Sequence, residues 1–410
     1  MITRLRTRTV AGLTWTGLSQ LGGQVIQLAT AVFLARRLLP VHFGTAGLAL
    51  AIITPLAALA QLGMTAALIQ RPGLTRAHYR TALISTAAAS SLCGFIFLVG
   101  GGLAGRLFHN PLLPPVLRLY SILMVLGAVT AVESAILGRF LDFRSQALAA
   151  LAARLVGSGT TVALAYANQG VMSIAWGFIA LTATNLALIY PRARRHRLTL
   201  PDSSQSDPHS HFLSMFHYSS GVMAANLLDQ LGLGLDTMLV ARLMGPVALG
   251  YYSFAAQLAL YLSRSLASVL DTVLFPSLAR VHEDTGRLRR AYLKLSRALI
   301  WFSLPVVLVA ALFAPWVVPC LFGGTWTPAV PLIQLLMLYA LFLFVFNSLT
   351  NSILKATGRS RTLTIFSAIR VTGIALSVLF GSRLGLTGVT LTLVAFAISY
   401  WLGTLIVVTS

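Results

Sequence analysis

Twelve apolar stretches, separated by short gaps, fill almost the whole chain. Each is about as long as, or longer than, the roughly 20 residues that an α-helix needs to cross the hydrocarbon core of a bilayer. The composition agrees, since 57% of the 410 residues are hydrophobic and only 10% are charged. We therefore predict an all-α polytopic membrane protein with twelve transmembrane helices. They are expected near 10–34, 44–69, 81–104, 112–137, 146–166, 170–190, 212–241, 247–278, 298–318, 328–354, 362–380 and 386–408.

The basic residues are sorted between the gaps in alternation. Of the 30 Lys and Arg, 21 lie in the N-terminal segment and in every second gap, and five lie in the other gaps. Short loops rich in Lys and Arg stay on the cytoplasmic side of a membrane. We therefore expect a multi-pass protein of the bacterial inner membrane with both termini in the cytoplasm. Because the net charge of +21 is dispersed over these loops, it indicates contact with anionic lipid headgroups and no nucleic-acid partner.

The second half of the chain repeats the first at a shift of 206 residues. Ala35-Arg36 aligns with Ala241-Arg242, and the later matches are Pro40 with Pro246, Gly44 with Gly250, and Gln24 with Gln230. Six helices in each half give both halves the same orientation, and such parallel repeats build transporters with a substrate path between the halves. We expect two six-helix lobes around a central cavity, at residues 1–190 and 212–410, joined by a cytoplasmic linker at 191–211.

The first and seventh predicted spans carry unusual polar residues. Gln20 and Gln24 share one helical face in the first, and Asn226, Asp229 and Asp236 lie in the seventh. Amides and carboxylates find no partners in lipid, so these faces point at other helices or at water. Hydrogen bonding between helices and the lining of a substrate cavity both remain open for the amides. Gln20, Gln24 and Asn226 are our candidates for substrate binding.

Four cations and four anions also lie inside the predicted spans. The cations are Arg118, Arg154, Arg264 and Arg370, and the anions are Glu133, Asp229, Asp236 and Asp271. A charge at the bilayer centre costs at least about 2.5–3.5 kcal/mol, so each needs a compensating environment. The equal numbers fit structural ion pairs, and they also fit a cationic cavity for an anionic substrate. Arginine suits a phosphate because its planar fork donates two parallel hydrogen bonds.

The four carboxylates are candidates for coupling transport to H⁺ or Na⁺. Asp229 falls near the middle of its span and is the first candidate, and Asp236 lies two turns further along the same helix face. Glu133 and Asp271 lie near the predicted cytoplasmic ends of their spans, where water or loop arginines can reach them. The pattern does not distinguish coupling from simple hydrogen bonding.

Other chemistry finds little support in the sequence. Cys93 and Cys320 provide no metal-ligand spacing, and no nucleotide-binding motif is present, so we predict no metal and no cofactor. A membrane-bound polymerase or ligase usually needs a large outer loop with catalytic groups. The largest outer loop here, around 322–328, is short and carries no charge. We therefore predict that the protein is not an enzyme.

Several segments together resemble a known family. Residues 34–44 read LARRLLPVHFG, residues 62–64 and 67–71 read LGM and ALIQR, and Arg139 precedes the tripeptide DFR at 142–144. These resemble, in order, the polysaccharide transporter family of the multidrug/oligosaccharidyl-lipid/polysaccharide (MOP) superfamily. The resemblance implies a flippase that moves an undecaprenyl-diphosphate-linked oligosaccharide from the cytoplasmic to the periplasmic leaflet by alternating access. It also implies the polysaccharide polymerase machinery as a partner.

Alternatives within the same superfamily are a lipid II flippase and a cation-coupled multidrug exporter. A drug exporter would favour a more acidic and aromatic cavity than the balanced charges found here. A protein that has lost transport and acts as a scaffold is a further alternative. The resemblance favours the saccharide substrate.

Overall fold

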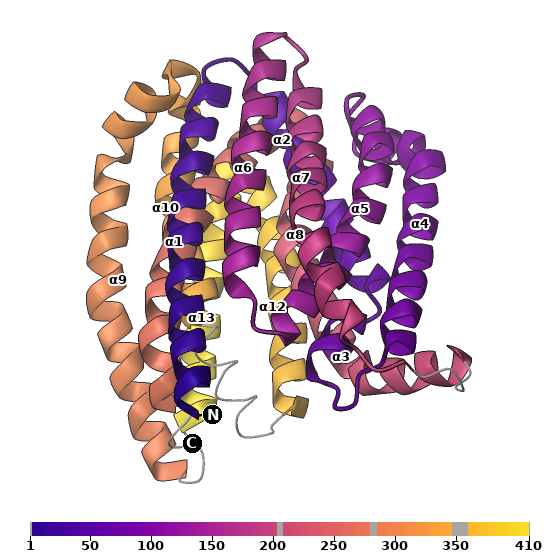
Figure 1. Ribbon diagram of the computed structural model, residues 1–410. Coiled ribbons are helices and arrows are strands. Elements are labelled where there is room, and N and C mark those ends of the chain that lie inside the picture. Colours follow the sequence, from indigo (N-terminus) through magenta and orange to yellow (C-terminus); the bar gives the residue numbers. More distant parts are fainter. Residues whose placement is uncertain (1, 203–207, 279–284, 347–359, 410) are drawn as a thin grey trace. The chain divides into compact units, whose positions relative to one another are not determined.

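The computed structural model is helical throughout the residues it describes, with no strand among them (Figure 1). Those residues are 2–202, 208–278, 285–346 and 360–409. The long helices are α1 (Ile2–Ala35), α2 (Pro40–Ala60), α3 (Met64–Gln70), α4 (Arg76–Leu107), α5 (Leu113–Arg139), α6 (Phe143–Tyr166), α7 (Val171–Leu198), α8 (Pro208–Leu278), α9 (Thr285–Phe322), α10 (Val330–Ala340), α12 (Ser360–Gly381) and α13 (Gly385–Thr409). Shorter turns are η1 (Gly324–Ala329), η2 (Leu341–Phe346) and η3 (Ser382–Leu384).

The predicted membrane spans fall on these helices, except for the part of the tenth span that lies outside the described residues. Within the described residues, ten helical stretches are long and apolar enough to cross a membrane, and the last of them, Ile365–Ile406, covers most of both α12 and α13. The prediction of an all-α, multi-pass membrane protein is therefore confirmed. The total of twelve stays a prediction, because the span expected at 328–354 runs into residues 347–359, which lie outside the described part.

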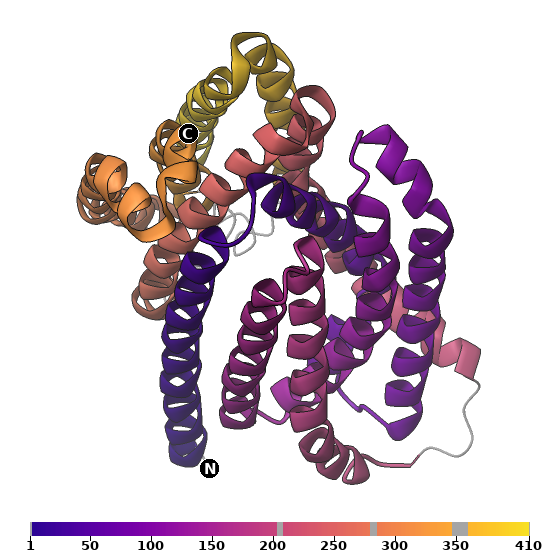
Figure 2. The ribbon, with the colours of Figure 1, turned by 90° about the horizontal axis from the view of Figure 1, so that it is seen from above.

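The chain divides into two compact units, Met1–Gly234 and Leu235–Ser410. In the first unit, α6 packs along α1 and α7, and α5 packs along α4 and α7, as the views in Figures 1 and 2 agree. In the second unit, α13 packs along α10 and α12, and α9 packs against α10.

Both units break their first long helix before a matching proline. Leu39 is extended (φ −73°, ψ 155°) and Pro40 begins α2, while Gly245 is non-helical (φ 81°, ψ 175°) before Pro246 inside α8. The proline ring disfavours the helical region for the residue that precedes it, so each break follows from the sequence. Leu39 and Gly245 are 206 residues apart, which supports the internal repeat.

Several helices differ from their predicted bounds, and two of these differences bear on the site. The second predicted span is divided into α2 and α3, because Leu62 (φ 51°) and Gly63 (φ 68°) both adopt left-handed conformations. The sixth continues past Pro191 to Leu198, into the segment predicted as a linker. Its last turn is held by side-chain contacts to neighbouring helices, described below.

Glycines allow α6 and α7 to approach closely. A methyl group added to Gly157 would lie 2.7 Å from Cβ of Leu181 and 2.9 Å from the carbonyl oxygen of Gly177. One added to Gly177 would overlap the hydroxyl of Thr161. Small residues at such crossings are typical of helix pairs in membranes, where close van der Waals packing drives association.

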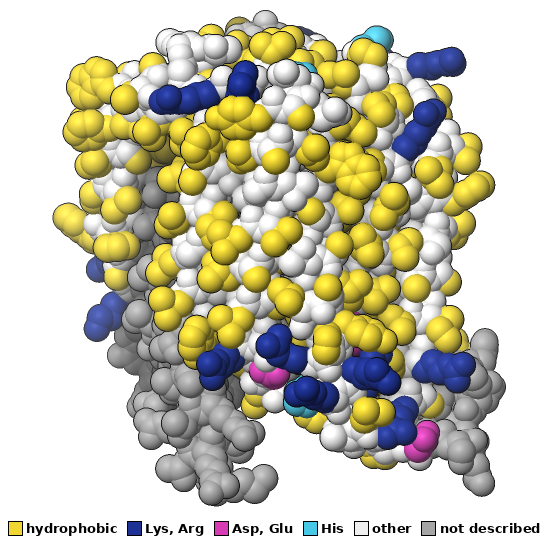
Figure 3. Space-filling model, turned by 45° about the horizontal axis from the view of Figure 1, so that its top comes forward, with side chains coloured by type: hydrophobic (Ala, Val, Ile, Leu, Met, Phe, Trp, Pro, Cys, Tyr) yellow, Lys and Arg dark blue, Asp and Glu magenta, His cyan; other side chains and the backbone are white. Residues whose placement is uncertain are grey.

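Large apolar side chains cover the outer faces of the helices. On α4, Leu92, Val99 and Leu103 are 63–73% exposed. On the face shown in Figure 3, Lys and Arg side chains gather toward the ends of the helices, and hydrophobic side chains cover much of the surface between them. This distribution is expected for helices that contact lipid along their middle and headgroups at their ends.

Candidate functional site

A buried polar cluster lies at the linker end of the first unit, the end at which α4 and α6 begin and α5 and α7 finish. Its centre is Glu133 of α5, whose side chain is fully buried. The hydroxyl of Tyr79 on α4 donates to Oε1 of Glu133 at 2.7 Å, and Nη1 of Arg197 on α7 donates to the same oxygen at 3.0 Å. Arg197 also contacts the Tyr79 hydroxyl. Three helices are thus joined through one carboxylate oxygen.

In the described part of the structure, the other carboxylate oxygen of Glu133, Oε2, lacks the contacts that Oε1 makes. Oε2 is buried and has no hydrogen-bond partner among the described residues. The guanidinium of Arg197 is held further by two aromatic rings, with its central carbon 4.8 Å from the ring centroid of Tyr79 and 4.9 Å from that of Tyr190. Cation–π contacts of this kind stabilise a partly desolvated arginine. The cluster is therefore a fixed ion pair within an aromatic surround.

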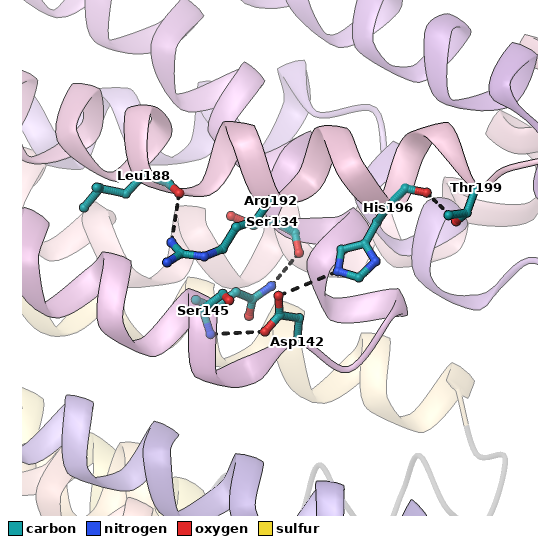
Figure 4. A network of polar contacts seen from close by, with 8 residues as sticks. Ser134, Asp142, Ser145, Leu188, Arg192, His196 and Thr199 are labelled. Carbon is teal, nitrogen blue, oxygen red and sulfur yellow. Dashed lines mark hydrogen bonds and ion pairs between the residues drawn. The ribbon is translucent and has the colours of Figure 1, made fainter.

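A contact between Asp142 and His196 ties α6 to α7 at the same end (Figure 4). Asp142 caps the N-terminus of α6 by accepting from the backbone N–H of Ser145 at 3.2 Å, and its other oxygen lies 3.7 Å from Nε2 of His196. The His196 ring stacks on Phe140, with centroids 4.6 Å apart and planes 15° apart. Beside them, the Gln146 amide donates to the carbonyl of Ser134 at 2.6 Å.

Two further arginines satisfy carbonyl groups at helix ends. Nη1 of Arg139 donates to three carbonyls at the end of α3, those of Leu68, Ile69 and Arg71, at 2.8–3.2 Å. The guanidinium of Arg76 donates to the carbonyl of Leu198 and pairs with Asp202, and its backbone N–H donates to the carbonyl of Pro201 at 3.0 Å. Carbonyls at a helix C-terminus lack hydrogen-bond partners within the helix, so these arginines supply the missing donors at the ends of α3 and α7.

The second unit contains its own buried polar cluster. Oδ2 of Asp236 on α8 accepts from the hydroxyl of Tyr252 at 2.6 Å, and Oδ1 accepts from the backbone N–H of Thr237 at 2.6 Å. Tyr339 of α10 lies close enough to Asp236, and to Arg370 of α12, to interact electrostatically with each of them. Asp236, Tyr252, Tyr339 and Arg370 are all at most 9% exposed. Two of our predicted functional residues, Asp236 and Arg370, are thus brought into one neighbourhood.

Among the described side chains, Arg118, Arg154, Gln20 and Asn226 do not join either cluster. Arg154 of α6 is half-buried, and its guanidinium lies over Gly23 of α1, where a methyl group would overlap it. Among the described residues, Arg154 has no hydrogen-bond or ion-pair partner. Gln24 and Asp229 are half-buried, while Arg118, Gln20 and Asn226 are exposed. The side chains of Arg264 and Asp271 lie outside the described part of the structure.

Sequence reasoning missed the residues that complete these clusters. Tyr252 and Tyr339 lie within predicted apolar spans, where a hydroxyl needs a partner, whereas Tyr79 lies in the gap before the third span and gives no such signal. The sequence places Arg197 among the basic residues of a loop. It also predicts that loop arginines can reach Glu133, and Arg197 does pair with it. Among the described residues, no group of three or more His, Cys, Asp or Glu could hold a metal ion.

Comparison with known proteins places the chain in a family. Residues 33–331 match the family described as polysaccharide biosynthesis protein. The chain is 25% identical to the lipopolysaccharide biosynthesis protein WzxC of Escherichia coli (strain K12), over 94% of this chain and 78% of WzxC. It is 24% identical to the amylovoran biosynthesis protein AmsL of Erwinia amylovora, over 72% of this chain and 76% of AmsL.

Solved structures share the fold at low identity. The lipid II flippase MurJ in an inward closed conformation aligns with a TM-score of 0.76 and 14% identity, over 98% of this chain and 88% of MurJ. A multidrug resistance MATE transporter of the MOP superfamily, in an inward-facing conformation, aligns with a TM-score of 0.70 and 18% identity, over 94% of each chain. The fold is therefore that of MOP-superfamily transporters, and the chain belongs to the polysaccharide biosynthesis protein family.

Proposed function

We propose that this protein is a flippase for surface polysaccharide biosynthesis. It translocates an undecaprenyl-diphosphate-linked oligosaccharide from the cytoplasmic to the periplasmic leaflet by alternating access. The observation that carries the proposal is the family match over residues 33–331. ExoT of Rhizobium meliloti (strain 1021), which is 25% identical over 79% of this chain and 64% of ExoT, is named a succinoglycan biosynthesis transport protein. The proposed activity moves a lipid and makes or breaks no covalent bond.

For the substrate site, we propose the intramembrane arginines and amides. Arg154 supports the idea best, because its guanidinium is half-buried and no described residue neutralises it. A diphosphate would supply the missing anion, and a guanidinium keeps its charge when it is desolvated. The full proposed set is Arg118, Arg154, Arg264, Arg370, Gln20, Gln24 and Asn226.

For coupling to H⁺ or Na⁺, we propose the membrane carboxylates Asp229, Asp236, Glu133 and Asp271. Asp236 and Glu133 are buried at the centres of the two polar clusters. Glu133 already has Arg197 as a fixed counter-ion, which disfavours a free cation there. Asp236 accepts hydrogen bonds from Tyr252 and Thr237, and in the described part of the structure it forms no ion pair. Of these two, Asp236 is therefore the better candidate for coupling.

Deleting the gene in its own host tests the proposed function. We expect loss of the surface polysaccharide and accumulation of the lipid-linked oligosaccharide, with both defects reversed by the gene on a plasmid. Drug susceptibility should not change, which separates this function from multidrug export. Normal surface polysaccharide in the deletion strain, with no second flippase present, would refute the assignment.

We propose two lobes, residues 1–190 and 212–410, with the linker at 191–211 and both termini in the cytoplasm. The excess of basic residues in alternate gaps supports this orientation. In a background with Cys93 and Cys320 replaced by Ser, single cysteines at positions 204 and 325 should react with a membrane-impermeant reagent from opposite sides. Labelling of both from one side would contradict the topology.

A further inference from the structure

The end of α7 extends beyond the thickness of the membrane core. The helix has 28 residues, and at 1.5 Å per residue it is roughly 42 Å long, against about 30 Å for the hydrocarbon core. The last two turns therefore lie among headgroups. Exposed Tyr190 lies just before them, as aromatic residues do at a membrane interface.

Three exposed arginines lie on these two turns. Arg192, Arg194 and Arg195 are exposed and form no ion pair in the described part of the chain. Arg192 donates only to the carbonyl of Leu188 in its own helix, at 3.2 Å. Arg144 is also exposed and lies over the ring of Trp15 at 5.1 Å. We call Arg144, Arg192, Arg194 and Arg195 the arginine rim.

The carboxylates near the rim are already engaged by other bases. Asp142 pairs with His196, Glu133 with Arg197, and Asp202 with Arg76. The Asp142–His196 contact also fixes the first turn of α6 beside the last turns of α7, where Arg192 lies (Figure 4). Within the described residues, none of these acids therefore forms an ion pair with an arginine of the rim.

We infer that the arginine rim is a binding site for phosphate groups carried by membrane lipids. The depth places these guanidinium groups level with lipid phosphates, and arginine binds phosphate through two parallel hydrogen bonds. Two lipids offer this chemistry: an anionic phospholipid, and the diphosphate lipid that carries the glycan. Capture of the second rests on the proposed function, whereas binding of the first does not.

The test uses purified full-length protein in detergent and measures affinity for phosphatidylglycerol, phosphatidylcholine and undecaprenyl diphosphate. The triple variant Arg192→Gln, Arg194→Gln, Arg195→Gln removes most of the rim. Each basic residue near an anionic surface contributes about a factor of five, so binding should weaken on the order of tenfold to a hundredfold. The matched control changes Arg37, Arg106 and Arg383, which are also exposed at helix ends but lie far apart in the sequence, to Gln and should weaken binding much less than the triple variant does.

The three lipids separate the two sources of phosphate. Selective loss of phosphatidylglycerol binding in the triple variant identifies the phospholipid, and selective loss of undecaprenyl diphosphate binding identifies the substrate lipid. Either result supports the site. Unchanged binding of both would overturn it, as would an equal loss of phosphatidylcholine binding. The melting temperature without added lipid should match that of the wild type, which excludes misfolding as the cause.

Discussion

Replacing Arg197 by Ala should destabilise the first unit by about 3–5 kcal/mol. The reason is that Glu133 is fully buried and would lose the one cation that pairs with it among the described residues, and an unpaired charge in an apolar interior is among the costliest defects a protein can carry. The loss should appear as a lower melting temperature of the purified protein and as less protein in the membrane.

Two further variants make this prediction specific. Arg194→Ala removes an exposed arginine from the same helix turn and should leave the melting temperature near that of the wild type. The double variant Glu133→Leu, Arg197→Met should recover at least part of the loss, since an apolar pair replaces the ion pair without leaving a buried charge. If Arg197→Ala and Arg194→Ala melt alike, the ion pair does not stabilise the fold.

Replacing Arg370 by Ala should reduce transport about tenfold to a hundredfold. Arg370 is only 8% exposed in the second unit, and a hydrogen bond from a charged group to a diphosphate contributes about 1.5–3 kcal/mol. Lys should restore part of the activity, because it keeps the charge and loses the planar fork. The measurement is the rate of surface polysaccharide formation, divided by the amount of folded protein in the membrane.

The alternative role for Arg370 is to balance charge in the cluster of Asp236 and Tyr339. In that case, Arg370→Ala would lower the melting temperature while transport per folded molecule stayed normal, and the substrate role would be refuted. Arg383→Ala serves as the matched control, because Arg383 is exposed and lies in the same unit. It should change neither quantity.

The helical fold was predictable because its main determinants are local. About 20 apolar residues and a basic gap identify each span without any knowledge of its neighbours, and Pro40 and Pro246 mark two helix starts directly. The extension of α7 was not predictable in this way. Pro191 and four arginines predict the end of a span, but Arg197 turns inward to Glu133, a residue 64 positions away in the chain.

The polar clusters were predictable only in part. The free-energy cost of placing a charge inside the membrane indicated that Glu133 and Asp236 need hydrogen-bond or ion-pair partners, and both have them. The identity of those partners depends on how helices cross, as with Tyr79 on α4 and Tyr252 on the second part of α8. Arg154 shows the same limit, since its position over Gly23 follows from the packing of α1 against α6.

The most direct test of the flippase proposal is a leaflet assay in proteoliposomes. Undecaprenyl-diphosphate oligosaccharide from the host is reconstituted into both leaflets with the purified full-length protein, and a membrane-impermeant glycosidase is added outside. A flippase should bring the inner-leaflet pool within reach, so that nearly all the glycan is cleaved, whereas vesicles without protein should lose only their outer-leaflet share. Cleavage limited to the outer-leaflet share in the presence of folded protein would contradict the account.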